Sequence, residues 1–452
     1  MIELISSIPL VGGFLSVVVP FIFVLLIVVY VHEMGHYLVG RWCGIHAETF
    51  SLGMGPVLAS RIDKHGTKWQ LAAIPIGGLV KFLGDADGAS TADHDALADM
   101  AASTRSKTFH GASVLRRALT VAAGPVFNFI LSILVFGSLL MYQGTASEDP
   151  VLGEVVEIPG VDNPLRAGDR LLSANGQPIS TLADFYDIGN AMAVPGPLQV
   201  VVRRDGAEMT LEAPYPALPL IYQVVPFSAA SRSDIQSGDF ITAIDGVPIS
   251  SFNELLNAVE TSDGKTLNLG MLRDGERISV ALAPTPEPVE LEDGSFTENW
   301  RIGVSLNPVY YPEKDYPGPI EGLKLGTLEV YNVISSSLNS IKHIFLGNLG
   351  ADNLQGPIGI AQISGAQAEQ GLVALIYLIG FISTAIGLIN LFPVPVLDGG
   401  HLCFFAYEAV AGRPPSQKAM NLIMPVGLAM VLLLMLFATY NDLVRLATQF
   451  MS

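Results

Sequence analysis

Long apolar stretches interrupt the chain four times, and none of them contains a charged residue. Because the hydrocarbon core of a bilayer is about 30 Å thick, about 20 helical residues are enough to cross it. The pattern therefore predicts four transmembrane helices. They cover residues 10–31, 118–141, 371–397 and 421–440.

Between the second and third stretches the pattern changes to short alternating runs, and this segment repeats itself. The phrase NPLRAGDRLLSANGQPIS, with Gly168 and Asp169, aligns with SRSDIQSGDFITAIDGVPIS, with Gly238 and Asp239. Farther along, RRDGAEMTLEAP from Arg203 aligns with LRDGERISVALAP. Internal similarity of this kind predicts two tandem copies of one small domain.

Each copy combines a Gly-Asp turn, an alternating apolar strand, an Asn-Gly or Asp-Gly hairpin turn, a helix-like segment and a final hairpin. This order resembles bacterial PDZ domains, which bind a peptide end as an added strand at a sheet edge. We place PDZ-like domains at 144–218 and 219–288. The alternative is a pair of β-rich domains that only fill space or block access. In the second copy Asp234 and Ile235 replace the usual Gly-Leu, which puts its peptide groove in question but not its fold.

A connector and an amphipathic helix are expected over 289–370. The connector begins in APTPEPVELEDG, which is rich in proline and acidic residues. Beyond it, apolar residues recur at intervals of three and four, which predicts a helix that packs on the membrane surface or against the spans. These residues are Tyr331, Ile334, Leu338, Ile341 and Phe345.

Composition supports a membrane protein, because half of the 452 residues are hydrophobic and only 15% are charged. The net charge is −18, and residues 144–321, with 27 acidic and 10 basic residues, carry nearly all of the imbalance. An acidic domain outside the membrane argues against nucleic acid and anionic lipid as its partners. With only Cys43 and Cys403, the chain has no disulfide framework.

Basic residues give the orientation, because cytoplasmic loops are enriched in lysine and arginine. The loop after the first span contains nine such residues and the loop before the fourth contains Arg413 and Lys418. Both loops are expected in the cytoplasm, and the N-terminus, the repeats and the C-terminus outside it. The residues before the first span include Glu3 and no lysine or arginine, whereas a signal peptide begins with basic residues. We therefore expect the first span to remain in the protein and not to be cleaved off.

The expected fold class is a polytopic α-helical membrane protein with two tandem β-rich domains inserted between its second and third helices. The boundaries outside the repeats follow from the same pattern. They are a first helix at 1–40, a cytoplasmic loop at 41–115, a second helix at 116–143, a third at 371–400, a second cytoplasmic loop at 401–420, and a fourth helix with its tail at 421–452.

Candidate chemistry begins with HEMGH at the end of the first span. His32 and His36 are four residues apart, so on a helix they project from one face and can bind one metal ion. Glu33 lies beside the first of them, where it can take a proton from an attacking water as general base. An HExxH match also occurs by chance, but polar groups at bilayer depth are rarely kept without a partner or a task.

A catalytic zinc site takes three protein ligands, and the best third candidate is distant in sequence. NLFPVPVLDGGHL places Asp398 at the end of the third span, where it is the only acid within roughly 35 residues. The first and third spans run in the same direction across the membrane. His32, His36 and Asp398 are therefore expected at the same depth, near the cytoplasmic side.

Together, HEMGH, GPVFNF, NLFPVPVLDGG and the tandem PDZ-like domains resemble the bacterial site-2 protease family, in its regulator-of-sigma-E protease (RseP) group. The resemblance covers essentially the whole chain in order. It implies Zn²⁺ held by His32, His36 and Asp398, with Glu33 as general base. It also implies single-pass membrane substrates, typically an anti-sigma factor already trimmed outside the bacterial inner membrane, and leaves clearance of remnant signal peptides open.

Substrate-binding residues are expected in two places. The segment IPIGGLVKFLGD reads as a looped strand, which in this family pairs with the substrate; the alternative is an ordinary cytoplasmic hairpin. Its candidates are Gly77, Gly78, Leu79 and Val80. The second place is the non-helical stretch before Asp398, with candidates Asn390, Pro393 and Pro395.

Three nearby polar residues have weaker assignments. Asn390 can hold substrate backbone or only bond across helices, as polar residues in membranes often do. For Asn128, beside the Gly124-Pro125 kink, we favour the structural role. His401 follows the LDGG turn closely enough to support the metal site, but no role is assigned to it.

Two other functions compete with the protease. One is a membrane-anchored PDZ scaffold whose metal site is structural or inactive, and such a site would not need the base Glu33. The other is a metal transporter, which fits poorly because the polar groups cluster at one end and no relay of acids or histidines crosses the bilayer.

Overall fold

The structure is a computed structural model that describes residues 12–85, 100–158, 160–225, 228–291 and 295–451. Its chain divides into two compact units. The first contains Met1–Leu140, Gly318–Lys342 and Gly350–Thr448, and the second is built mainly from Met141–Pro317. Each unit is described by itself below.

Four helices of the first unit are long and apolar enough to span a membrane, which confirms the predicted number for the described residues. They are α2 (Gly12–Trp42), α5 (Val114–Gln143), α10 (Leu372–Asn390) and α12 (Gln417–Met451). Leu10 and Val11, where the first span was expected to begin, lie outside the described residues. The third helix ends at Asn390, seven residues before the predicted 397, because Pro393 and Pro395 break the helical hydrogen bonding.

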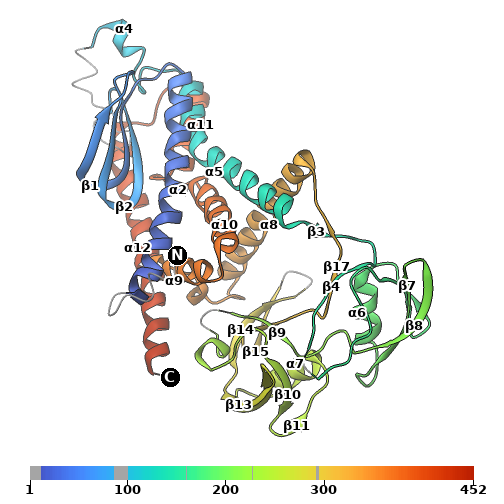
Figure 1. The fold of residues 1–452 in the computed structure, drawn as a ribbon. Coiled ribbons are helices and arrows are strands. Elements are labelled where there is room, and N and C mark those ends of the chain that lie inside the picture. The colour runs from blue at the N-terminus through green and yellow to red at the C-terminus, as the bar shows by residue number, and fades with distance from the viewer. Residues whose placement is uncertain (1–11, 86–99, 159, 226–227, 292–294, 452) are drawn as a thin grey trace. The chain divides into compact units, whose positions relative to one another are not determined.

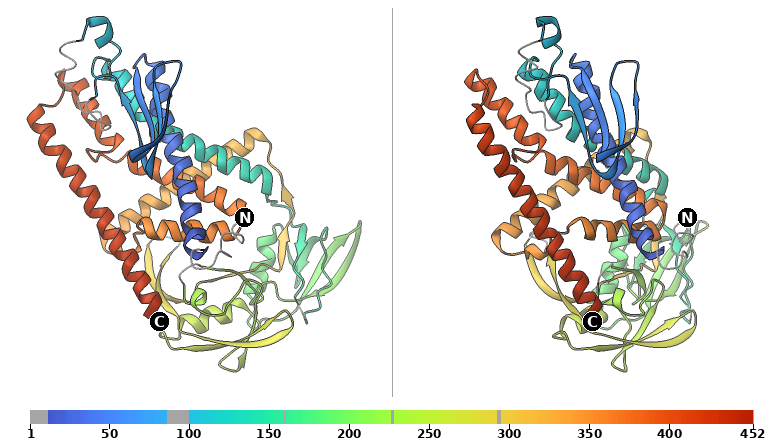
Figure 2. Two further views of the ribbon diagram at one scale, coloured as in Figure 1. Left: turned by 60° about the vertical axis from the view of Figure 1, so that its left-hand side comes forward. Right: turned by 90° about the vertical axis from the view of Figure 1, so that its left-hand side faces the viewer.

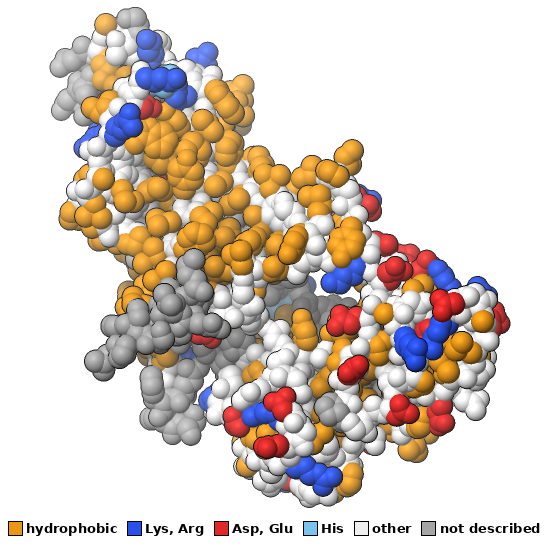
Figure 3. Space-filling view, in the orientation of Figure 1, with side chains coloured by type: hydrophobic (Ala, Val, Ile, Leu, Met, Phe, Trp, Pro, Cys, Tyr) orange, Lys and Arg blue, Asp and Glu red, His pale blue; other side chains and the backbone are white. Residues whose placement is uncertain are grey.

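The remaining helices of the first unit are shorter or amphipathic. They are α4 (Ala102–Arg105), α8 (Pro319–Leu346), a 3₁₀ turn (Ala351–Asn353), α9 (Pro357–Glu369) and α11 (Asp398–Ala411). In the view of Figure 3, apolar side chains cover most of the face over the spanning helices, as expected for a lipid-facing surface.

Helix α8 forms where an amphipathic helix was expected, but of its predicted apolar stripe only Ile334 joins the main contact with the spans. Tyr331, Leu338 and Phe345 of that stripe are exposed. A neighbouring face, with Val330 and Val333, packs against α5. Glycines on both helices allow this close approach, and the exposed stripe remains available to lipid.

The C-terminal helix is tied to the rest of the unit by a buried acid. Asp442 on α12 is 2% exposed. Its carboxylate accepts hydrogen bonds from the backbone N–H groups of Gly356, at 3.1 Å, and Gly359, at 2.9 Å, where α9 begins. A carboxylate at a helix N-terminus satisfies the free N–H groups there.

A small sheet lies against α2 in all three ribbon views, near the end where HEMGH is located (Figures 1 and 2). It consists of β1 (Ala47–Ile62) and β2 (Lys68–Phe82). The strands bend where Gly53 and Gly77 adopt positive φ angles. As a result, residues 49–52 have partners both in 68–71 and in 78–81. Among the described residues, 78–81 have no other partner, so this segment is an edge of the sheet.

The second unit contains two four-stranded sheets of the same design, which confirms the repeat seen in the sequence. The first has the order β6-β5-β7-β8 and carries α6, and the second has β11-β10-β12-β13 and carries α7. Their bounds are β5 (Arg170–Ala174), β6 (Gln177–Pro178), α6 (Leu182–Asn190), β7 (Leu198–Arg204), β8 (Ala207–Ala213), β10 (Phe240–Ile244), β11 (Val247–Pro248), α7 (Phe252–Glu260), β12 (Leu267–Arg273) and β13 (Glu276–Leu282).

The repeated Gly-Asp phrase has a structural reason. Asp169 receives two hydrogen bonds from Arg204, the shorter at 2.6 Å, and Asp239 receives the equivalent pair from Arg273. Both aspartates are fully buried. A buried carboxylate needs such a partner. Both repeats therefore contain the acid of the first turn together with the arginine before the last hairpin.

The segment expected as a connector differs from that expectation. It forms strands rather than a simple link: two of them pair with each other, and three pair with strands that lie earlier in the chain. The pairs are β14 (Thr285–Glu290) with β15 (Phe296–Arg301), β16 (Val304–Leu306) with β9 (Ile221–Val224), β17 (Tyr310–Pro312) with β4 (Leu152–Val155), and β18 (Lys314–Asp315) with β3 (Thr145–Ala146). A short 3₁₀ helix, Ala230–Arg232, precedes β10. Residues 292–294 of the connector lie outside the described residues.

Candidate active site

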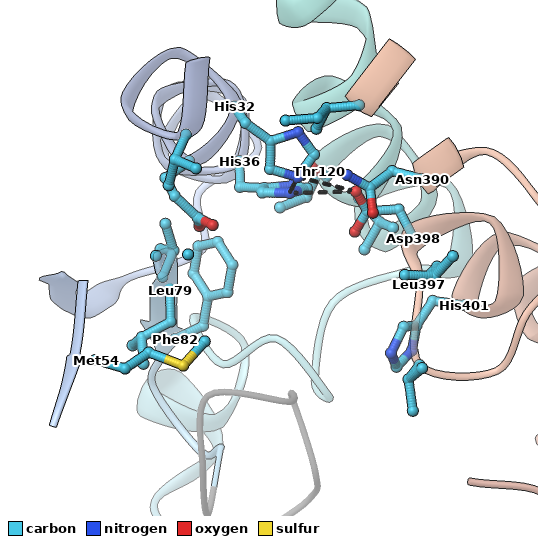
Figure 4. A pocket seen from close by; sticks show the side chains of 18 of the residues that line it. His32, His36, Met54, Leu79, Phe82, Thr120, Asn390, Leu397, Asp398 and His401 are labelled. Carbon is cyan, nitrogen blue, oxygen red and sulfur yellow. Dashed lines mark hydrogen bonds and ion pairs between the residues drawn. The ribbon is translucent and has the colours of Figure 1, made fainter. Parts of the chain in front are cut away.

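Three side chains from two distant segments meet in the first unit, as the sequence predicted (Figure 4). His32 and His36 project from one face of α2, and Asp398 begins α11. The distance between His32 Nε2 and His36 Nε2 is 3.2 Å. Asp398 Oδ2 lies 3.2 Å from His32 Nε2 and 3.5 Å from His36 Nε2.

The chemistry of these three groups fits a metal ion. His36 donates from Nδ1 to the Thr120 carbonyl oxygen at 2.9 Å, so a neutral ring keeps Nε2 as an acceptor. That nitrogen faces the buried Asp398 Oδ2, which forms no hydrogen bond with any described residue. Acceptors that face one another in a buried site call for a cation between them. Tetrahedral zinc bound at about 2.0–2.2 Å would separate its ligand atoms by roughly 3.3–3.6 Å, close to the distances found here.

Helix α5 positions both histidines, and sequence reasoning underestimated this contribution. Besides the Thr120 carbonyl, the fully buried Asn128 places its amide nitrogen 3.3 Å from His32 Nδ1. The Asn128 Oδ1 atom has no partner among the described residues. A half-turn of the amide would let Oδ1 accept from the Nδ1–H of His32, the arrangement that metal-binding histidines usually have. Asn128 belongs to the GPVFNF motif, which could have indicated this role, but the sequence analysis favoured a structural role for it.

Gly124 leaves the space that the two rings occupy. A Cβ atom at this position would lie 2.3 Å from His36 Nε2 and 2.8 Å from His32 Cε1. On the facing helix, a Cβ at Gly35 would lie 2.4 Å from the Ala123 carbonyl oxygen. These paired glycines let α2 and α5 approach closely enough for α5 to support the site.

Glu33 is the candidate base. It is 8% exposed, lines the same cavity as the histidines, and forms no hydrogen bond with a described residue. The β2 edge approaches it closely, because a Cβ at Gly78 would lie 2.7 Å from Glu33 Cγ. The carboxylate is therefore free to exchange a proton with water or substrate in the cavity.

The cavity has a volume of about 500 Å³ and is bounded by two walls. In Figure 4, Met54, Leu79 and Phe82 form one wall, and Asn390, Leu397 and His401 lie on the other. The predicted substrate-binding residues Gly77, Gly78, Leu79, Val80 and Asn390 all line it.

Pro393 and Pro395 do not line this cavity. Pro393 is exposed, and Pro395 packs where a Cβ added to Gly427 of α12 would lie 2.8 Å from its ring. The prolines therefore act on the path of the chain between α10 and Asp398. Gly399 and Gly400 follow Asp398 in the first turn of α11, where an added Cβ would lie within 2.3 Å of backbone oxygens of the segment before the helix.

Comparison with known proteins is consistent across the chain. The model of peptidase family M50 matches residues 20–434. A protein of Agrobacterium fabrum that is named as a zinc metalloprotease is 37% identical over 95% of this chain and 97% of its own length. The regulator of sigma-E protease RseP of Escherichia coli is 32% identical over 96% of this chain and 100% of its own, and that of Salmonella typhi is 31% identical over 94% and 98%.

Proposed function

Because this chain belongs to peptidase family M50, the site-2 proteases, and is a zinc metalloprotease of that type, we propose that it cleaves the membrane-spanning segments of single-pass membrane proteins. The observation that carries the proposal is the meeting of His32, His36 and Asp398 beside Glu33 in one cavity. A soluble peptide would not need this chemistry on a membrane helix.

His32, His36 and Asp398 would hold the metal, and Thr120 and Asn128 would fix the two imidazoles. A bound zinc ion supplies a Lewis acid that polarises the peptide carbonyl and makes water more acidic. Glu33 takes a proton from the attacking water and returns it to the leaving nitrogen, which lets the C–N bond break. Gly78 allows the β2 edge to lie close to that carboxylate.

Substrate must unwind before it is cleaved, because the peptide bonds of a helix are shielded by their own hydrogen bonds. We propose that residues 77–80 of β2 bind the unwound segment as an added strand. The free edge of the sheet and its place in the cavity wall support this role. Asn390 on the opposite wall would bind substrate backbone.

For the biological substrate, we propose a membrane-bound anti-sigma factor trimmed beforehand on its outer side, with remnant signal peptides as a second class. Support comes from the E. coli and S. typhi relatives, whose names describe regulators of sigma E. The protein would sit in the bacterial inner membrane with its active site toward the cytoplasm, as the basic loops favour. The repeats, as PDZ-like domains in the periplasm, would bind peptide ends or exclude bulky substrates.

A scaffold with an inactive metal site is the competing function, and comparing cells with wild-type protein and the Glu33→Gln variant distinguishes the two. The proposal predicts that single-pass proteins or their trimmed fragments accumulate in the membrane proteome of Glu33→Gln cells. Asp63→Asn, a substitution of an acid outside the cavity, serves as the control. Identical membrane proteomes in wild-type and Glu33→Gln cells would contradict the proposed function.

A further inference from the structure

His401 is a polar residue of the cavity that the chemistry above does not use. It lies on the first turn of α11, three residues after Asp398, and it lines the cavity. Its backbone N–H bonds to the Leu397 carbonyl, but its ring nitrogens form no hydrogen bond with any described residue. Phe404 packs edge-on against the ring, with centroids 6.1 Å apart and planes at 87°.

The described residues give this ring no hydrogen bond, although Asp85, His110 and Asp398 lie near enough to interact with it electrostatically. The cavity near it is lined largely by apolar side chains such as Phe82, Phe109 and Leu397. A polar group without a hydrogen bond in such an environment is unfavourable, and a packed ring cannot easily turn away to water. His401 is therefore arranged to bond with something that enters the cavity.

The position of His401 indicates which part of a substrate it would meet. A strand added to β2 has one edge paired with residues 77–80 and a second edge with free N–H and C=O groups. That second edge faces the wall of α10 and α11, where most backbone groups are used within the helices. Side chains on this wall can pair with it.

Two polar side chains on this wall flank Asp398 in Figure 4, Asn390 on one side and His401 on the other. Groups that point the same way along a strand recur every two residues, about 6.6–6.8 Å apart. Two separated hydrogen-bonding residues can therefore bind successive groups of one strand edge, on either side of the bond to be cleaved.

We propose that His401 is a substrate-binding residue that donates a ring N–H to a backbone carbonyl of the unwound substrate, on the edge that β2 leaves unpaired. It replaces a hydrogen bond that the substrate loses when its helix opens. This inference rests on the proposed function. It assigns His401 to binding of the unwound state and not to proton transfer, which belongs to Glu33.

The test combines His401→Leu, which removes the donor at similar volume, with His401→Gln, which retains an N–H donor. Cys403→Ala on the exposed part of the same helix is the matched control. Binding of a single-pass model substrate is measured by fluorescence on the Glu33→Gln background, where it is not cleaved. Zinc content, kcat and KM are measured with Glu33 present.

We expect His401→Leu to weaken substrate binding about five- to tenfold, the usual effect of one hydrogen bond, with zinc content and kcat nearly unchanged. His401→Gln should recover most of the binding. Unchanged binding in His401→Leu, or an equal loss in both variants, would overturn the proposal. Failure of the wild-type protein to cleave any membrane substrate would instead contradict the proposed function, so the two are distinguishable.

Discussion

Substitution of Gly124 by alanine tests whether α5 shapes the metal site. The added Cβ would lie 2.3 Å from His36 Nε2, and contacts of this kind are ordinary only from 3.4 Å. The ring must therefore move by about 1 Å, a displacement that can reduce catalysis about 100-fold when it affects a reacting group. The ring cannot move freely, since its Nδ1 is bonded to the Thr120 carbonyl.

The expected loss of zinc affinity and cleavage in Gly124→Ala is not an effect of helix stability. Alanine is favoured over glycine in a helix by about 1 kcal/mol, so propensity alone would make the variant more stable. We predict instead that Gly124→Ala binds zinc about 10- to 100-fold more weakly, the usual effect of disturbing groups behind metal ligands, and loses about 100-fold in cleavage rate.

The first assay measures how much zinc the protein retains in the presence of a competing chelator, with the zinc content determined by elemental mass spectrometry. The second measures cleavage of a membrane substrate in detergent. Gly13→Ala is the matched control, because Gly13 lies on α2 and an added Cβ there meets nothing within 4 Å. Wild-type zinc affinity and cleavage in Gly124→Ala would show that α5 does not set the positions of the two imidazoles.

Two further substitutions test the supports of the fold and the site. Asn128→Ala should free His32 to rotate and weaken zinc binding about 10-fold or more in the same chelator competition, and unchanged affinity would argue against a role for this amide. Asp442→Ala should leave two buried N–H groups without a partner and destabilise the protein by about 3 kcal/mol or more, measured by denaturant unfolding in detergent micelles. Asp442→Asn keeps one acceptor and should lose less; equal stability of wild type and the alanine variant would contradict the role of this acid.

The metal-binding triad could be predicted because its signals are local. His32 and His36 are four residues apart on an evident helix, and Asp398 is an acid at the end of an apolar stretch. Both features are unusual enough in a membrane segment to require an explanation. The structure brings all three together within hydrogen-bonding distances.

The supporting residues could not be predicted with the same ease. Gly124 and Asn128 occupy a second helix, and their importance depends on how closely α5 approaches α2, which no periodicity encodes. Small and polar residues are common wherever membrane helices pack. For the same reason, the face of α8 that contacts α5 is formed mainly by valines and glycines, and of the stripe that the sequence emphasised only Ile334 packs with them among the described residues.

The strands in the segment expected as a connector were not predicted, for a different reason. β16 and β17 have three residues each and pair with β9 and β4, which lie far earlier in the chain. Such short strands show no clear alternation of apolar and polar residues. Their pairing depends on which strands of the repeats they contact. The repeated turns, by contrast, were visible because the same Gly-Asp and Arg-Asp-Gly phrases occur in both copies.

In the proposed reaction, Glu33 performs the proton transfers of a metal-dependent peptide cleavage in the membrane. The most direct measurement compares wild-type protein and Glu33→Gln, purified and reconstituted in lipid with a single-pass substrate, for zinc content and for cleavage products identified by mass. We expect equal zinc content and a loss of cleavage of about 100- to 10,000-fold, the usual range for removal of a general base. Cleavage by Glu33→Gln at the wild-type rate would contradict this role of Glu33.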